Sequence, residues 1–306
     1  MRVLFAGTPA VALPSLEALR AAGHEIVAVL TRPDAPLGRK RVLTPSPVAA
    51  RAEELGLPVI KADKIDAGAA AAISAAGPDV AAIVAYGALI PESALSIPAH
   101  GWINLHFSLL PAWRGAAPVQ HSIINGDEVT GASTFLLEKG LDTGPVYGTM
   151  TESIAASDTS EVLLQRLSHS GAVLLAQTID GIAAGQISGV PQQGEITLAP
   201  KLTLEDGHVQ WGDPALAINR RVRGVTTEPG AWTMLGGQRF KLGPVAMRAD
   251  VTDLAPAQLR VEGKAVLVGT GSHAVELVEV QPAGKKMMKA TDWARGLANK
   301  EDVVFE

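Results

Sequence analysis

Three side chains in the middle of the chain have the types and spacing that acyl transfer requires. Asn104 supplies an amide, His106 an imidazole and Asp142 a carboxylate, and Pro and Gly residues surround each of them. A carboxylate can orient a histidine that moves protons, and an amide can donate a hydrogen bond to a developing oxyanion. The chain has no Cys, and this stretch has no G-x-S-x-G elbow to supply a serine nucleophile. The pattern therefore indicates direct transfer of an acyl group between two bound substrates.

Each of these residues also has a simpler structural interpretation when it is taken alone. His106 can be a strand-end histidine that bonds to the backbone, Asn104 can terminate a strand, and Asp142 can bond its own backbone in a turn. Asn104 and His106 are two residues apart, so on a strand their side chains point to the same side. The residue types alone leave the structural and the catalytic interpretations open.

The same segments resemble a known family. Residues 104–111 have the sequence Asn-Leu-His-Phe-Ser-Leu-Leu-Pro, and residues 140–144 have the sequence Gly-Leu-Asp-Thr-Gly. This combination is similar to the signature of the folate-dependent formyltransferases, which use 10-formyltetrahydrofolate as formyl donor. The resemblance implies that Asn104 binds the oxyanion, that His106 transfers the proton of the attacking amine or polarises the formyl oxygen, and that Asp142 orients His106.

Three further stretches narrow the resemblance to the branch of that family that formylates methionine on initiator tRNA. They are residues 5–9, residues 33–39 together with 45–47, and residues 280–287. The resemblance covers nearly the whole chain, and it implies transfer of the formyl group to the methionine α-amino group in translation initiation. It implies initiator methionyl-tRNA and tetrahydrofolate as partners, with the folate consumed as a co-substrate, no tightly bound cofactor and no metal.

The resemblance also implies which residues bind the two substrates. Two segments are expected to line the folate site: Ser108, Leu109, Leu110 and Pro111, with Val84, Ala85, Tyr86 and Gly87. Two basic clusters are expected to contact tRNA: Arg39, Lys40 and Arg41, with Lys285 and Lys286. Without the resemblance, the first set is a tight loop and a strand end, and the second is a solvated face. The first basic cluster falls in residues 32–47, which we expect to form a long irregular loop.

The periodicity of the first half predicts alternating strands and helices. Short apolar runs at 3–6, 26–30, 80–84 and 102–105 are typical of buried parallel strands. Such strands, separated by helices, predict an α/β fold with a doubly wound, Rossmann-like parallel sheet. Ligands bind to such sheets beyond the carboxyl ends of the strands, which is where His106 lies.

The C-terminal part has a different pattern. Short apolar segments separated by Gly turns predict a small, OB-like β barrel, at residues 231–235, 238–242, 258–262, 265–268 and 274–280. A stretch rich in Gly, Pro and Gln precedes them and is typical of a linker. We therefore expect a formyltransferase domain with the folate and catalytic site over residues 1–188, a linker over 189–204 and a tRNA-contacting β-barrel domain over 205–306.

Composition limits the remaining possibilities. A length of 306 residues suggests two cores, and a hydrophobic content of 47% argues against disorder. No apolar run is long enough to span a membrane. The absence of Cys excludes disulfides and thiol nucleophiles and fits a reducing cytoplasm. The net charge of -5 means that any RNA contact must use local basic clusters. We expect a monomeric cytoplasmic protein.

Three alternatives remain. The first is a formyltransferase that acts on a small amine such as glycinamide ribonucleotide, although that class resembles only the first domain. The second is a nucleotide-binding α/β module, which fits the fold but is weakened because Gly7-Thr8-Pro9 is not a G-x-G-x-x-G fingerprint. The third is a non-catalytic RNA-binding protein, which would have no use for the amide, imidazole and carboxylate together.

Overall fold

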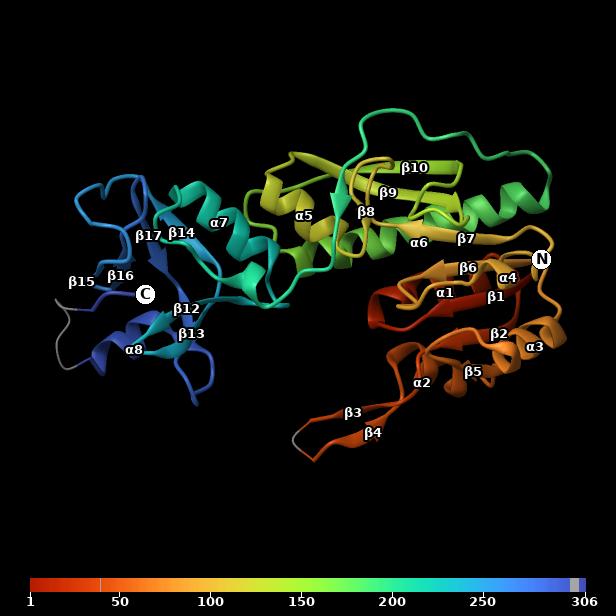
Figure 1. Cartoon of the computed structure of the whole chain (residues 1–306), viewed down its shortest axis with the longest axis horizontal. Coiled ribbons are helices and arrows are strands. Elements are labelled where there is room, and N and C mark those ends of the chain that lie inside the picture. The colour runs from red at the N-terminus through yellow and green to blue at the C-terminus, as the bar shows by residue number, and fades with distance from the viewer. Residues whose placement is uncertain (39, 298–302) are drawn as a thin grey trace. The chain divides into compact units, whose positions relative to one another are not determined.

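The computed structural model describes residues 1–38, 40–297 and 303–306, which form two compact units (Figure 1). The first unit consists of three stretches, Met1–Pro118, Val129–Ser153 and Leu164–Ala199. The second also consists of three, Val119–Glu128, Ile154–Leu163 and Pro200–Glu306. Each unit therefore combines segments that are distant in the sequence, and the domain limits given above stay a prediction.

The first unit is built around a seven-stranded sheet with the strand order β10-β9-β7-β6-β1-β2-β5. Its strands in chain order are β1 (Arg2–Gly7), β2 (Glu25–Thr31), β5 (Val59–Lys61), β6 (Val80–Val84), β7 (Trp102–His106), β9 (Val129–Leu136) and β10 (Val146–Ser153). The strands β1, β2, β5, β6 and β7 pair in parallel, which confirms the predicted α/β class. The strands β9 and β10 add an antiparallel edge. The sequence did not reveal β9, because this buried strand contains Thr, Gly and Ser instead of an apolar run.

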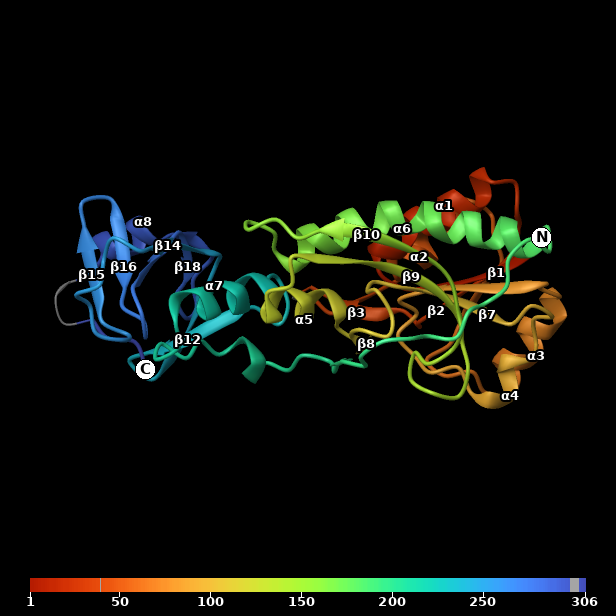
Figure 2. The same ribbon diagram turned by 90° about the horizontal axis from the view of Figure 1, so that it is seen from above.

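Helices cover both faces of this sheet. In Figure 2, α1 (Leu13–Ala21) and α6 (Ser160–Ala183) lie on one face, and α3 (Ala67–Ala76) and α4 (Glu92–Leu95) lie on the other. The remaining helix, α2 (Pro47–Glu54), begins at a cap. The Ser46 side chain accepts a hydrogen bond from the Ala49 N–H, and Asp66 caps α3 in the same way at the Ala69 N–H. The helix α6 packs through an apolar face, and its buried leucines are Leu163, Leu167 and Leu175.

The sheet has a topological switch point between β1 and β6. From β1 the chain builds outward through β2 and β5, and it then crosses to the other side of β1 to form β6 and β7. A hydrogen bond spans this point just beyond the strands, since the Thr8 Oγ1 donates to the Tyr86 carbonyl at 2.7 Å. Such a point at the carboxyl ends of the strands is where ligands bind to open α/β sheets.

Part of the predicted long loop is ordered as a hairpin. The strands β3 (Ala35–Leu37) and β4 (Val42–Thr44) pair antiparallel. Leu37, Val42 and Leu43 on this hairpin are largely exposed, at 68%, 59% and 68%. The alternation of apolar and polar residues is too short here to predict strands, so the sequence indicated an irregular loop.

The segment that follows α6 runs beside the loop after β7. The short strand β11 (Leu198–Ala199) pairs in parallel with β8 (Arg114–Gly115). The Arg114 N–H also donates to the Thr197 carbonyl at 2.9 Å. This end of the predicted linker is therefore hydrogen-bonded to the loop and is part of the first unit.

The second unit contains two four-stranded antiparallel sheets, ordered β12-β13-β18-β19 and β14-β17-β16-β15. The strands are β12 (Ala231–Leu235), β13 (Gln238–Leu242), β14 (Val245–Arg248), β15 (Leu259–Glu262), β16 (Ala265–Val268), β17 (Ala274–Leu277), β18 (Glu279–Gln281) and β19 (Met288–Lys289). The helical elements of this part are α5 (Pro118–Asn125), η2 (Glu205–Gly207), α7 (Ala215–Gly224) and α8 (Ala290–Arg295). One apolar cluster draws on both sheets and on α7 and α8. The predicted β-rich C-terminal part is confirmed, although the predicted strand 274–280 is divided between the two sheets.

Candidate active site

The strand β7 holds Asn104 and His106. It is an inner strand, paired with β6 on one side and with β9 on the other. Leu105 between them is buried against the opposite face, so the two polar side chains share the other face. The Asn104 side chain is half-buried and makes no hydrogen bond with any residue that the structure describes. Its amide is therefore available to a ligand at the end of the sheet.

The contacts of His106 define which of its nitrogens can act as a base. Its Nε2 lies 2.9 Å from the Trp113 carbonyl oxygen, and a carbonyl oxygen can only accept, so Nε2 carries the proton. The other nitrogen, Nδ1, then has a free lone pair in the neutral ring, and it lies 3.8 Å from Asp142 Oδ2. Burial lowers the pKa of His106, while Asp142 and the Trp113 carbonyl act to raise it. The geometry thus presents a neutral imidazole whose Nδ1 can take a proton beside a carboxylate.

Asp142 occupies a backbone conformation that few side chains adopt. Its φ of 49° is in the left-handed region. Its Oδ2 accepts a hydrogen bond from the Gly115 N–H at 2.7 Å, and the 3.8 Å to His106 is too long for a hydrogen bond. The following Gly144 is required for steric reasons, because a Cβ there would lie 1.8 Å from the Leu136 carbonyl oxygen. The loop therefore brings the carboxylate next to the imidazole without a direct hydrogen bond, and the catalytic role of the pair stays a prediction.

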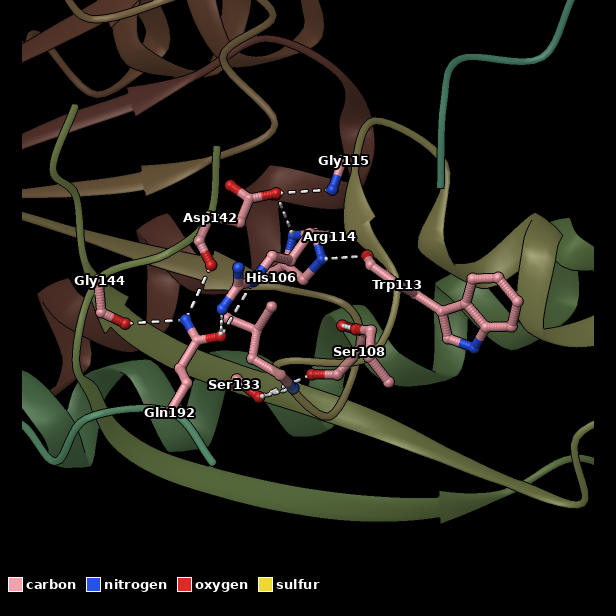
Figure 3. A network of polar contacts seen from close by, with 11 residues as sticks. His106, Ser108, Trp113, Arg114, Gly115, Ser133, Asp142, Gly144 and Gln192 are labelled. Carbon is pink, nitrogen blue, oxygen red and sulfur yellow. Dashed lines mark hydrogen bonds and ion pairs between the residues drawn. The ribbon is translucent and has the colours of Figure 1, made fainter. Parts of the chain in front are cut away.

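Two serines hold the loop after β7 in place through hydrogen bonds (Figure 3). The Ser108 hydroxyl donates to the Ala112 carbonyl at 2.6 Å. The Ser133 hydroxyl on β9 donates to the Ser108 carbonyl at 2.7 Å and accepts from the Leu110 N–H at 3.1 Å. Of the four residues predicted here for folate binding, Ser108 and Pro111 are buried. Leu109 and Leu110 are partly exposed, so these two can contact a ligand directly.

The second predicted folate segment begins at the end of β6. Val84 is fully buried, whereas Ala85, with a φ of 49°, and Gly87 are exposed. The Tyr86 ring is buried in the core at 1% exposure, and its hydroxyl donates to the Ala62 carbonyl at 2.7 Å. Burial raises the pKa of this hydroxyl. Only the backbone and small side chains of this segment therefore face outward, and its role in folate binding stays a prediction.

The basic residues predicted to contact tRNA lie on exposed turns. Lys40 and Arg41 are in the turn between β3 and β4 of the first unit, and Arg39 lies outside the described residues. Lys285 and Lys286 are exposed in the turn that joins β18 to β19 in the second unit. Their contact with RNA stays a prediction.

Sequence reasoning missed Gln192, a residue of the predicted linker that joins this network (Figure 3). Its side-chain Nε2 donates to the carbonyls of Asp142 and Gly144, both at 2.8 Å. Its Oε1 accepts from Arg114 Nε at 3.1 Å and from Arg114 Nη2 at 2.7 Å. A glutamine in a Gly-, Pro- and Gln-rich stretch gives no signal of its own, because its partners are about fifty residues or more away along the chain.

Within residues 1–38, 40–297 and 303–306, no group of three or more His, Asp or Glu side chains is placed to hold a metal ion. No described helix is long and apolar enough to cross a membrane. The candidate site consists of Asn104, His106 and Asp142, with the loop and linker residues that hold them.

The comparisons with known proteins agree with this fold. A family model described as formyl transferase matches residues 1–179, and one described as formyl transferase, C-terminal domain, matches residues 201–298. The chain therefore belongs to the formyl transferase family. Within that family, it is 72% identical over its full length to the methionyl-tRNA formyltransferase of Pseudarthrobacter chlorophenolicus, all of which is covered.

Two solved structures show the same fold. The methionyl-tRNA formyltransferase from Clostridium thermocellum superimposes with a TM-score of 0.57 at 16% identity, covering 81% of this chain and 94% of that one. HypX from Aquifex aeolicus in complex with tetrahydrofolic acid superimposes with a TM-score of 0.64 at 16% identity, covering 96% of this chain and 47% of that one. At these identities the likeness establishes the fold alone.

Proposed function

We propose that this enzyme transfers the formyl group of 10-formyltetrahydrofolate to the α-amino group of methionine on initiator tRNA, at the site formed by Asn104, His106 and Asp142. The observation that carries the proposal is the pairing of His106 Nδ1 with the Asp142 carboxylate at the end of β7. The full-length likeness to methionyl-tRNA formyltransferases supports this acceptor. We further propose that the enzyme is a cytoplasmic monomer and uses 10-formyltetrahydrofolate as a co-substrate, without a tightly bound cofactor or metal.

In this reaction the α-amino nitrogen attacks the formyl carbon, and a new C–N bond forms. A free α-amino group has a pKa of about 7.7–8.0, so part of it is already neutral near pH 7. His106 accepts the proton that the amine loses, and its Nδ1 is the nitrogen with a free lone pair. The bond from the formyl carbon to N10 of the folate then breaks, and N10 takes up a proton. The negative charge of Asp142 stabilises the imidazolium that exists between these steps.

Negative charge develops on the formyl oxygen when the amine attacks. The Asn104 amide is on the same face of β7 as His106 and has no hydrogen-bond partner among the described residues. It can therefore donate to the oxyanion without breaking a bond of its own. Donors that are already in place cost no reorganisation during the reaction, and each is worth about 10²–10³ in rate.

The donor and the acceptor need separate binding surfaces. For the folate we propose the partly exposed Leu109 and Leu110, together with the outward-facing backbone at Ala85 and Gly87. For the tRNA we propose the exposed basic turns with Lys40 and Arg41 and with Lys285 and Lys286, to which Arg39 is added from the sequence. These lysines and arginines would contact phosphates, which bind in a salt-dependent way.

A formylation assay tests the proposal directly. Purified protein is incubated with 10-formyltetrahydrofolate carrying a labelled formyl group and with either methionyl initiator tRNA or glycinamide ribonucleotide. We expect label in the methionyl-tRNA and none in the ribonucleotide. Uncharged tRNA is the matched control, because it has the same phosphates but lacks the amine. Transfer to the ribonucleotide alone would show that the enzyme acts on a small amine.

A further inference from the structure

We infer that Gln192 is a positioning residue that holds the catalytic loop around Asp142 in place from the linker. The inference rests on the proposed function, because it assigns to Gln192 a role in the same transfer reaction. Among the described residues, no hydrogen bond joins Gln192 to His106. Gln192 acts through the backbone carbonyls of Asp142 and Gly144, and Arg114 in turn binds Gln192 (Figure 3).

The amide of Gln192 uses its full hydrogen-bonding capacity. Both protons of Nε2 are donated, one to the Asp142 carbonyl and one to the Gly144 carbonyl, each at 2.8 Å. Both acceptor positions of Oε1 are taken by Arg114, whose Nε and Nη2 lie at 3.1 and 2.7 Å. An amide satisfied in this way on all four sides has a single orientation. Its partners are therefore fixed relative to one another, and two of them are the backbone carbonyls of Asp142 itself and of Gly144.

Asp142 needs such support more than an average residue does. Its left-handed φ of 49° costs a residue with a Cβ more than a helical or extended backbone does, although Asp tolerates it better than most side chains. Its carboxylate has no hydrogen bond to His106 at 3.8 Å, so the imidazole does not hold it. Within the part of the chain that the structure describes, the carboxylate accepts one hydrogen bond, from the Gly115 N–H. The direction of the carboxylate is thus set by that bond and by the backbone that Gln192 holds.

The linker also contacts Trp113, whose carbonyl oxygen accepts a hydrogen bond from His106 Nε2. The Trp113 N–H donates to Thr197 Oγ1 at 2.8 Å, and the Trp113 carbonyl faces His106 Nε2. The Arg114 N–H donates to the Thr197 carbonyl at 2.9 Å. The linker therefore contacts both sides of the pair. Thr197 holds Trp113, whose carbonyl fixes the tautomer of His106, and Gln192 holds the loop that carries the Asp142 carboxylate.

The test compares Gln192→Met with Gln193→Met in the formylation assay. Methionine has nearly the length of glutamine but makes none of the four hydrogen bonds, and Gln193 is the exposed neighbour. For Gln192→Met we expect kcat to fall on the order of 10- to 100-fold, because small misplacements of catalytic groups have effects of this size. We expect the affinity for folate to change by less than about twofold, and Gln193→Met to behave as the wild type.

The pH profile distinguishes positioning from a purely structural role. The carboxylate acts to raise the pKa of His106, so its displacement lowers that pKa. Since His106 acts as a base in its neutral form, the acid limb of kcat should move to lower pH in Gln192→Met. A structural role alone would reduce the melting temperature or the amount of active protein and leave this limb unchanged, and that result would overturn the inference.

A second variant covers the case in which Gln192→Met fails to fold. Gln192→Glu keeps the acceptor for Arg114 but loses both donors to the carbonyls of Asp142 and Gly144, so the linker stays attached. It should lose activity like the methionine variant, and full kcat in Gln192→Glu would overturn the inference. If the wild type itself does not formylate methionyl-tRNA, the proposed function fails instead, which the parallel wild-type assay shows.

Discussion

The residues of the candidate site are held in place in two different ways, by strand pairing in the sheet and by side-chain hydrogen bonds in a loop. Asn104 and His106 lie on β7, an inner strand whose backbone is paired on both sides, so the sheet fixes their positions. Asp142 lies in a loop with a left-handed backbone, and side chains from other segments fix its position. Strand residues need few special partners, whereas a loop residue depends on every contact around it. The two kinds of residue should therefore respond differently to substitution.

The largest expected effect is that of Asp142→Asn. Asparagine has the same shape and can still accept from the Gly115 N–H, so we expect the fold to be intact. It lacks the charge that stabilises the His106 imidazolium, and comparable changes in a catalytic triad reduce kcat by about 10⁴-fold. Formylation kinetics and thermal unfolding are measured together. Near-normal turnover would remove Asp142 from the mechanism, and a large fall in melting temperature would make it a structural residue.

Protonation of His106 should also affect the stability of the wild type. Its pKa is lowered in the folded state, chiefly by burial, so the unfolded chain binds the proton more tightly. The folded state therefore gains its full advantage above the unfolded pKa of about 6.5. That advantage is lost as the pH falls below this value toward the lowered pKa of the folded state. Melting curves between about pH 7.5 and 5 test this, and His106→Gln should have a flatter dependence on pH.

Asn104→Ala tests the residue that the strand holds without help from other side chains. We expect kcat to fall about 100- to 1,000-fold, because an oxyanion donor acts mainly in the transition state. Stability should change little, since the Asn104 side chain makes no hydrogen bond within the described part of the chain. Steady-state kinetics with folate as the varied substrate are the measurement. A loss of folate affinity with kcat preserved would show that Asn104 binds the donor instead.

The sequence predicted the strand-held part of this site much better than the loop-held part. The apolar run before His106 is enough to place Asn104 and His106 at the end of a buried strand, because alternation and burial are local properties. Alternation fails beyond a strand end, and the left-handed Ala85 turns the next residue, Tyr86, into the core. Gln192 could not be found from the sequence, because its role depends only on distant residues that folding brings next to it.

A smaller effect is expected for Arg41→Ala, because Arg41 lies in an exposed turn outside both the central sheet and the loop around Asp142. Lys40 and Arg41 are exposed, so they would act on tRNA through charge alone. We expect the KM for methionyl-tRNA to rise several-fold at low salt, while the affinity for folate stays constant. The plot of the logarithm of tRNA affinity against the logarithm of salt concentration should become less steep, by about one in slope. Lys64→Ala, another exposed lysine of the first unit, is the control for charge. An equal loss in both variants would point to a general effect of net charge.

The smallest effect is expected for Tyr86→Phe, which tests whether the strand-end segment after β6 binds folate through its side chains. The Tyr86 ring is in the core and its hydroxyl bonds the Ala62 carbonyl, so its loss should lower stability by roughly 0.5–1.5 kcal/mol. The dissociation constant for folate should change less than about twofold, because a buried hydroxyl cannot contact a ligand. Leu110→Ala is the comparison, since that side chain is partly exposed and its removal should weaken folate binding. If Tyr86→Phe weakens folate binding as much as Leu110→Ala does, the segment must rearrange when folate binds, and Tyr86 must leave the core.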